Sequence, residues 1–498
     1  MGKLTDKVAK GVFWVLMEKF GIQAAHFVVT LVLARLLTPN DYGTVALLSV
    51  FVAVSNVLVD SGFSKALVQK KDATQTDYNT VFYISMALAA VLYSALFFSA
   101  PLVAKFYDVP ELGAMLRVMA LSLVFHSLNN VQGVEMNRKM LFHLSFRISW
   151  ARVAVSAVVG VALALAGYGP WALVWASVSG GVAGVIARQL VIRWRPTLSF
   201  SWDSARSLFR FGWKMMAASL LNSVFSNLYA LVIGKFYTKA DLAFVKKGSH
   251  IPKLIGNTAD ATLSKVTFPA LVRLQDDPAK LRNAMRRMIK CSTFVVFPLM
   301  ACSALVAEPM VALMYGDRWL PIVPFVQLTC FAVAFKPFDS INFQAINARG
   351  RSDIYLKLIV LRRVAGLLLM ALALPYGVMT FMVCSAIVYG PIGVVMNSLP
   401  NRNVLKYSIA MQLCDVLPSL ALTVVLAAVV FGIGCIPVGG KLLLFPQVAV
   451  GFAVYGALAV WLRFRPVGEF ADMLLPHVRK RSAGLSRPVE WLSRRCSK

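Results

Sequence analysis

Polar side chains recur at helical spacing within apolar segments, and their types and positions decide what chemistry the chain could perform. Lys19, Gln23 and His26 lie at intervals of four and then three residues, so they share one face of a helix. In a second segment Asn56 and Asp60 lie four residues apart. Charged groups in apolar surroundings persist mainly where they face a wet interior. These faces therefore predict a polar cavity between the helices.

Three further apolar segments carry similar polar residues and complete the set that we predict to contact a ligand. This part of the set comprises Asn222, Lys253, Asn257, Asp260, Lys336, Asp339 and Asn342. A competing interpretation is that the asparagines and serines hold neighbouring helices together, each hydrogen bond contributing about 1 kcal/mol or less. Asp60 could instead pair with Lys65 at a helix end, and His26 alone is more typical of a packing residue.

Other motifs that carry chemistry are not found in the sequence. None of the seven cysteines has CxxC or metal-ligand spacing, and there is no Ser-His-Asp arrangement, P-loop or Gly-rich nucleotide turn. We therefore predict no catalytic residue, no metal and no cofactor, and we expect that the protein is not an enzyme. The net charge of +29 would favour nucleic acid in a soluble protein. No basic-aromatic RNA-binding motif is present, however, and we predict no nucleic-acid partner.

The polar residues must be positioned by helices that span a membrane. Hydrophobic residues make up 58% of the 498 residues, charged residues 15%, and the mean hydropathy is +0.70. Apolar runs follow one another along nearly the whole chain, each with about the 20 residues that a helix needs to cross a bilayer. The expected fold is all-α, a polytopic membrane protein with about fourteen transmembrane helices. They are expected at residues 11–36, 43–67, 79–104, 113–136, 147–166, 171–193, 207–236, 250–273, 291–315, 322–346, 356–374, 378–397, 414–434 and 441–464.

Two pairs of similar segments indicate an internal duplication. The sequence "LVLARLLTPNDYGTV" at 31–45 matches "LVIGKFYTKADLAFV" at 231–245, and the register holds without a gap from 31/231 to 65/265. Likewise "FHSLNN" at 125–130 resembles "FDSINF" at 338–343. Six expected spans separate the members of each pair, so the repeats are parallel and both copies have the same orientation in the membrane.

The duplication predicts two six-helix lobes, at residues 1–200 and 201–400, followed by two helices at 401–465 and a basic cytoplasmic tail at 466–498. We expect the polar faces of the first, second, seventh and eighth spans to line one cavity between the lobes. Most of the 51 lysines and arginines lie between spans, on the side that the N-terminus shares. By the positive-inside rule both termini are expected to be cytoplasmic, with the first segment kept as a span rather than removed as a signal peptide.

Five segments of the chain resemble one known family. They read "VDSGFSKALVQKKDATQTDYNTVFY", "LVIGKFYTKADL", "SKVTFPALVRLQDD", "EPMVALMYGDRWLPIVPFVQL" and "NARGRSDIYLKL". They are similar to segments of the bacterial Wzx-type polysaccharide flippases, which belong to the multidrug/oligosaccharidyl-lipid/polysaccharide exporter superfamily. The similarity runs from about residue 10 to about residue 400. The chain departs from the family pattern at "AFVKKGSH", so contacts that relatives make with this loop cannot be transferred.

The resemblance implies a flippase that moves an oligosaccharide on an undecaprenyl diphosphate carrier from the inner to the outer leaflet of the bacterial inner membrane. The product would serve exopolysaccharide, O-antigen or capsule synthesis, and the cycle would be alternating access. The implied partners are the lipid-linked oligosaccharide, membrane lipids and a polysaccharide polymerase or export complex. Lysine ammonium groups in a wet cavity would suit a diphosphate.

Three other functions stay open. A cation-coupled drug or metabolite exporter of the same superfamily would more typically use a carboxylate to exchange H⁺ or Na⁺. A lipid II flippase carries another lipid diphosphate, and the sequence barely separates the two. A membrane polysaccharide polymerase or ligase tends to carry a large external loop with catalytic residues. The longest expected external loop, about 235–249, has no such cluster beyond Asp241 and His250.

Overall fold

The computed structural model describes residues 21–435 and 443–468, apart from Ser61, Lys71, Met140 and Arg193. Within this part all regular structure is helical. Twelve helical segments are long and apolar enough to cross a membrane. The predicted all-helical membrane fold is therefore confirmed, whereas the total of fourteen spans stays a prediction.

Two of the fourteen expected spans are not among those twelve segments. The first is described only as the helix Gly21–Leu36, because the residues before it lie outside the described part. The eighth corresponds to a helix over residues 250–272 that is long enough but carries Lys253, Asp260 and Lys265. Its charge, rather than its length, separates it from the others.

Packing divides the chain into two compact units, Met1–Ala243 and Phe244–Lys498. The first unit contains the helix Gly21–Leu36 and the following elements: α2 (Pro39–Asp60), α3 (Phe63–Gln69), α4 (Gln75–Phe106), α5 (Glu111–Arg138), α6 (Phe142–Leu165), α7 (Pro170–Val191) and α8 (Trp202–Phe236). The next helix, α9 (Lys239–Gly248), crosses the division. The boundary predicted between the two six-helix lobes, at residues 200 and 201, was inferred from the sequence duplication and stays a prediction.

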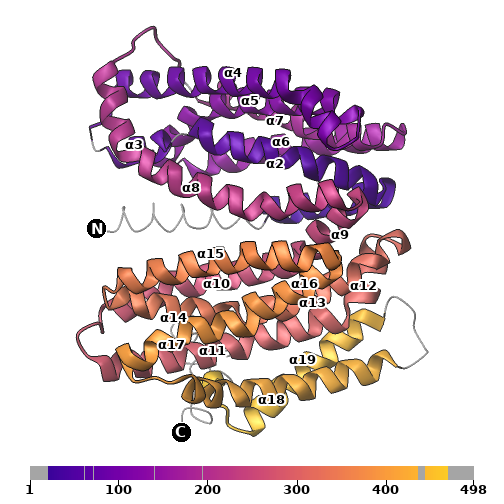
Figure 1. Cartoon of the computed structure of the whole chain (residues 1–498), viewed down its shortest axis with the longest axis vertical. Coiled ribbons are helices and arrows are strands. Elements are labelled where there is room, and N and C mark those ends of the chain that lie inside the picture. The colour runs from indigo at the N-terminus through magenta and orange to yellow at the C-terminus, as the bar shows by residue number, and fades with distance from the viewer. Residues whose placement is uncertain are drawn as a thin grey trace, which may run out of the picture. The chain divides into compact units, whose positions relative to one another are not determined.

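In the first unit the long helices pack side by side, α4 on α5, α5 on α7 and α7 on α6 (Figure 1). Helix α2 packs against α5 and α8. The contact of α3 with α8 depends on two glycines, because a Cβ on Gly62 would lie 2.1 Å from the carbonyl oxygen of Gly212. Gly62 also has a φ of +69°, in the left-handed region that side chains rarely adopt.

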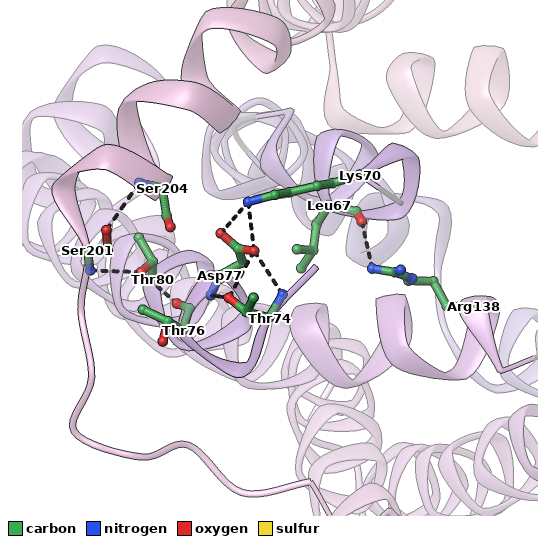
Figure 2. Close-up of polar contacts among 9 residues, drawn as sticks. All are labelled: Leu67, Lys70, Thr74, Thr76, Asp77, Thr80, Arg138, Ser201 and Ser204. Carbon is green, nitrogen blue, oxygen red and sulfur yellow. Dashed lines mark hydrogen bonds and ion pairs between the residues drawn. The ribbon is translucent and has the colours of Figure 1, made fainter. Parts of the chain in front are cut away.

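A partly buried ion pair joins the end of α3 to the start of α4 (Figure 2). The Lys70 ammonium donates to both oxygens of Asp77 at 2.8 Å. The same carboxylate accepts the backbone N–H of Thr74 at 2.9 Å, and the Thr74 hydroxyl in turn accepts the N–H of Asp77. This reciprocal box starts α4. At the neighbouring turn the Ser201 N–H donates to the Thr80 hydroxyl at 3.1 Å, which holds the start of α8 against α4.

The second unit is built mainly from long helices and from helices broken into two parts. Its elements are α10 (His250–Val272), α11 (Pro278–Leu305), α12 (Ala307–Met314), η1 (Asp317–Ile322), α13 (Val323–Ala334), α14 (Lys336–Ala348), α15 (Ser352–Ala373), η2 (Leu374–Tyr376), α16 (Val378–Ile387), η3 (Val388–Ile392), α17 (Gly393–Leu405), α18 (Ile409–Gly434) and α19 (Leu444–Trp461).

Two of the spans expected in the second unit have other boundaries in the structure. The span expected at 291–315 begins earlier, because the Asp277 carboxylate caps α11 by accepting the N–H groups of Ala279 and Lys280 at 3.0 Å. The span expected at 322–346 breaks at Phe335 between α13 and α14. Pro337 lies in the first turn of α14, directly after this break.

The duplicated segments fold alike at their first turns. The Thr38 hydroxyl donates to the Asp41 carboxylate at 2.8 Å and accepts the Asp41 N–H at 3.3 Å, which caps α2. Thr238 and Asp241 repeat this pair before α9, at 2.6 Å and 3.1 Å. Equal spacing in the sequence thus produces equal local geometry, which supports the duplication.

Candidate functional site

A polar cavity of about 700 Å³ lies within the first unit. It is enclosed by α2, α3, α5, α6 and α7, with Met215 of α8 at its edge. Its polar lining includes Asn56, His126, Asn129, Asn130, Arg152 and Arg188, together with several serines. No aspartate or glutamate is among the described residues that line it. The cavity is therefore rich in hydrogen-bond donors and has positive charge.

Helix α5 supplies three of these side chains from one turn. The Asn129 amide donates to the carbonyl oxygen of Phe125 at 2.8 Å, which fixes its rotamer against its own helix. The Asn130 carbonyl accepts the Ser64 hydroxyl of α3 at 2.6 Å. Helix α7 approaches closely because Gly181 lies against the Phe125 ring, where a Cβ would be 3.0 Å from the ring. The close helix packing is what keeps the polar turn in place.

The two arginines enter the cavity from different helices. Arg188 on α7 donates from Nη1 to the carbonyl oxygen of Asn129 at 2.5 Å. Arg152 on α6 lines the same cavity. Arg152 lies in the middle of an apolar helix and Arg188 in the last turn of one, and a guanidinium in apolar surroundings costs several kcal/mol unless it is solvated or paired. A wet cavity thus supplies the solvation that these residues require.

A smaller cavity of about 220 Å³ lies where α2 meets α8, lined by Asp60 and Ser219 among others. The polar faces expected on the second and seventh spans therefore meet within the first unit. Asp60 also contacts Nε2 of His126 at 2.9 Å. Ser64 and Met215 line both cavities, so the two lie side by side.

In the second unit the segment "FDSINF", which corresponds to "FHSLNN" of the first unit, belongs to a buried polar network rather than to the wall of an open cavity. The Asp339 carboxylate on α14 accepts Nη1 of Arg362 at 2.5 Å and the Asn397 amide. One turn later Asn342 donates to Gln412 at 3.0 Å and accepts the Asn401 amide at 2.8 Å. Asp339 is 8% exposed and Asn342 is fully buried. The charges of this network are paired within the protein.

A second cluster in the same unit joins α10 to α14. Lys336 donates to the Asn257 side chain and lies 3.9 Å from the Asp260 carboxylate. Lys253 is exposed on α10. The structure thus brings Asn257, Asp260 and Lys336 together as three neighbouring members of the predicted set.

The remaining predicted residues are distributed as follows. Lys19 lies outside the described residues. Gln23 is partly buried and His26 exposed on the helix Gly21–Leu36, and Asn222 is exposed on α8 and lines neither of the two cavities. Asn56 lines the larger cavity and Asp60 the smaller one. Whether these residues contact a substrate stays a prediction.

Sequence reasoning missed the two arginines of the larger cavity. Arg152 falls within the span expected at 147–166 and was an intramembrane cation, whereas Arg188 was assigned to the basic residues at the cytoplasmic end of the span expected at 171–193. That position was the available signal, because intramembrane charges mark functional sites by default. His126 and Asn129 belong to the "FHSLNN" segment, which was used only as a sign of duplication.

Comparison with known proteins identifies the family. The model of the family described as polysaccharide biosynthesis protein matches residues 32–324. "Lipopolysaccharide biosynthesis protein WzxC" of Escherichia coli (strain K12) is 23% identical over 361 residues, which cover 71% of this chain and 72% of that protein. "Succinoglycan biosynthesis transport protein ExoT" of Rhizobium meliloti (strain 1021) is 24% identical over 321 residues, 64% of this chain and 65% of that protein.

Among solved structures, the lipid II flippase MurJ in an inward closed conformation has the same fold. It aligns with a TM-score of 0.68 at 14% identity, and the match covers 91% of this chain and 99% of that one. Two of these proteins are named for polysaccharide biosynthesis, one of them as a transport protein, and the third is named a flippase, and the predicted resemblance is confirmed. The family match spans more than half of the chain, and the chain therefore belongs to the polysaccharide biosynthesis protein family, as a multi-span membrane transport protein rather than an enzyme.

Proposed function

We propose that the chain is a flippase that moves an oligosaccharide linked to undecaprenyl diphosphate from the inner to the outer leaflet of the bacterial inner membrane. The cargo would supply a surface polysaccharide such as exopolysaccharide, O-antigen or capsule. The observation that carries the proposal is the polar cavity of about 700 Å³ inside a helical unit of a polysaccharide-biosynthesis membrane protein. The cycle proposed is alternating access, with both termini in the cytoplasm.

The lining of the cavity suits a saccharide. Sugar hydroxyls lose their water on entering a membrane, and each unpaired hydroxyl costs about 1–3 kcal/mol. Asn56, Asn129 and Asn130 offer amide donors and acceptors that can replace that water. A volume of this size is in the range of sites that enclose small organic ligands. The lipid tail needs no such site, because it can stay in the bilayer while the polar head crosses.

The rival function, a cation-coupled drug exporter of the same superfamily, requires a carboxylate facing its cationic substrate. The larger cavity carries Arg152 and Arg188, and none of the described residues lining it is acidic. A cationic substrate would be repelled there. Asp60 lines only the smaller cavity and already contacts His126. The charge of the cavity thus favours a neutral or anionic cargo.

A transport assay tests the proposal. The full-length protein is reconstituted in liposomes with a fluorescent oligosaccharide on undecaprenyl diphosphate, and a quencher that cannot cross the membrane is added outside. Empty liposomes should lose only the signal of the outer leaflet, and proteoliposomes nearly all of it. A double variant, Asn129→Ala with Asn130→Ala, should slow this loss, while Arg206→Gln at the exposed start of α8 should not. Equal quenching with and without protein would reject a flippase.

A further inference from the structure

An apolar cavity of about 530 Å³ lies in the first unit where α2, α4 and α8 meet. It shares no lining residue with either of the two polar cavities. Its volume is in the range of about 300–1,000 Å³ that is usual for ligand pockets. Its apolar lining includes Phe51 of α2, Leu102 and Phe106 of α4, and Leu231, Val232 and Phe236 of α8.

This apolar cavity is open on the outer surface of the helical unit. The side chains of Leu102, Phe106 and Phe236 on its rim are each more than half exposed. In a membrane-spanning unit such an apolar rim faces lipid chains rather than water. A ligand that enters from the bilayer therefore needs no polar passage to reach the cavity.

Lys235 is the only charged residue among the described residues that line this cavity. It lies in the last turn of α8. Its ammonium donates to the backbone carbonyl of Phe106, lies 3.3 Å from the Asp108 carboxylate, and lies 4.8 Å from the centre of the Phe106 ring. The Tyr107 hydroxyl donates to the Leu231 carbonyl at 3.3 Å. The cavity thus has apolar walls and one cation at its end.

The Lys235 ammonium has the capacity to bind a further acceptor. An ammonium carries three N–H donors, and its hydrogen bonds to the described residues use two of them. The pair with Asp108 is weak, because that carboxylate is 83% exposed and water screens it. The Lys235 side chain is itself 31% exposed, so an anion can reach it. These features suit a ligand that has an anionic group as well as an apolar part.

The position of the cation along the helices indicates which ligand this is. Both α4 and α8 are long and apolar enough to span a membrane, and they end at Phe106 and Phe236. The Phe106 and Tyr107 rings meet edge to face there, with centroids 5.0 Å apart. Aromatic and lysine side chains at the ends of spans lie at the level of lipid headgroups. From this level the lining extends over residues 102–106 and 231–236, which is about 6–8 Å along the helices.

We propose that this cavity binds an anionic phospholipid of the surrounding bilayer, with the phosphate at Lys235 and one acyl chain along the apolar lining. The phosphate oxygens accept the remaining N–H of the ammonium in a charge-assisted hydrogen bond. The acyl chain contacts walls that have no polar group to satisfy. A phosphodiester carries a single negative charge, which matches the single cation of the site better than a diphosphate does. The bound lipid contacts both α4 and α8 and therefore stabilises their packing.

Native mass spectrometry of the full-length protein in detergent measures binding of individual lipids. The probes are dioleoylphosphatidylglycerol, dioleoylglycerol, which has the same chains without the phosphate, and undecaprenyl phosphate. We expect the phosphatidylglycerol to bind about three- to tenfold more tightly than the dioleoylglycerol, the value of a partly exposed charge-assisted hydrogen bond. Equal affinity of these two lipids would overturn the proposal. Tighter binding of undecaprenyl phosphate than of phosphatidylglycerol would assign the cavity to the carrier lipid and would overturn it as well.

Two lysine variants locate the phosphate. Lys235→Gln should weaken phosphatidylglycerol about three- to tenfold and leave dioleoylglycerol unchanged. Lys105→Gln is the matched control, because it removes an equal charge from an exposed position in the last turn of α4 that does not line the cavity. It should leave binding unchanged. If both variants weaken binding equally, the lipid is attracted by surface charge alone and the proposed site is wrong.

A third variant locates the acyl chain. Val232→Phe fills part of the cavity without changing its charge, so both dioleoyl lipids should bind about fourfold more weakly or worse, the equivalent of one buried CH₂ group. Wild-type affinity in this variant would show that the chain lies elsewhere. Phosphatidylglycerol should also raise the Tm of the wild type more than that of Lys235→Gln, because a ligand stabilises the state that binds it. An equal rise in both proteins would contradict the site. None of these measurements depends on transport, so they test the lipid site separately from the proposed function.

Discussion

Asp415 on α18 joins the last two helices to the rest of the second unit, and its removal should destabilise the protein strongly. One carboxylate oxygen accepts Nε of Arg286 and the hydroxyl of Tyr407, both at 2.7 Å. The other accepts Nη2 of Arg286 at 2.8 Å and Nζ of Lys290 at 3.0 Å. Four donors thus converge on a carboxylate whose side chain is 4% exposed.

The magnitude follows from what each donor would do without the carboxylate. The side chains of Arg286 and Lys290 are 37% and 33% exposed, so water can replace much of their lost pairing, and their share is at the low end. Tyr407 is fully buried, and its orphaned hydroxyl costs about 1–3 kcal/mol. We expect Asp415→Ala to cost about 3–4 kcal/mol in total, within the range for breaking a buried pair. Asp415→Asn keeps an acceptor and should cost about half as much.

Thermal unfolding in detergent, followed with a thiol-reactive dye, measures this loss. Cys291, Cys302 and Cys330 are buried and become reactive on unfolding, while the exposed Cys414 and Cys435 give a constant background. At about 2–4 °C per kcal/mol for a unit of this size, Asp415→Ala should lower the Tm by roughly 6–15 °C.

Two controls isolate the orphaned hydroxyl. Lys290→Ala should lower the Tm by no more than about 3 °C, because its partner keeps three other donors. Adding Tyr407→Phe to Asp415→Ala should recover part of the loss, because the buried donor is gone. A Tm of Asp415→Ala that equals that of Lys290→Ala would show that the network is surface-like and that the reasoning from burial is wrong.

Three further predictions concern the junction of α3, α4 and α8 and the second cluster. Asp77→Ala removes a carboxylate that is 1% exposed and that forms part of the capping box of α4. It should lower the free energy of unfolding by about 2 kcal/mol and therefore lower the Tm. An unchanged Tm would mean that the box is not formed. Gly62→Ala combines left-handed backbone with a Cβ 2.1 Å from the Gly212 oxygen and should cost roughly 2–4 kcal/mol, whereas an equal Tm would contradict the close approach. Lys253→Ala and Lys336→Ala should each lower surface polysaccharide while the protein level holds, and normal polymer output from both would refute a role of these ammonium groups in cargo contact.

The fold was largely predictable because its signals are local. Length and hydropathy of each run decide whether a helix can cross a bilayer, and the helices follow the expected order. The Thr38–Asp41 box and its copy at Thr238 were visible as equal spacing before any contact was known. Hydropathy does not predict that α11 starts at Pro278. The start is set by Asp277, whose capping depends on side-chain hydrogen bonds rather than on apolar content.

The site was less predictable because it depends on which faces meet. The sequence shows that Asp60 lies on a polar face, but not that this face meets His126 of α5 rather than Lys65. It shows Asp339 and Arg362 as isolated charges 23 residues apart, and only the packing of α14 against α15 turns them into a pair. Partners between helices are set by side-chain packing, about which hydropathy carries no information.

Duplication explains how one chain can contain both an open and a closed version of the same polar turn. Both copies keep an arginine on a helix that follows the motif, Arg152 on α6 and Arg362 on α15. A carboxylate at position 339 satisfies Arg362 from within, so the second unit needs no ligand there and gains a fixed packing of α14, α15 and α17. In the first unit the equivalent position holds His126, which lies on the wall of the cavity and contacts the Asp60 carboxylate at 2.9 Å. A single difference in charge between the copies thus accompanies a closed, internally paired network in one unit and an open polar cavity in the other.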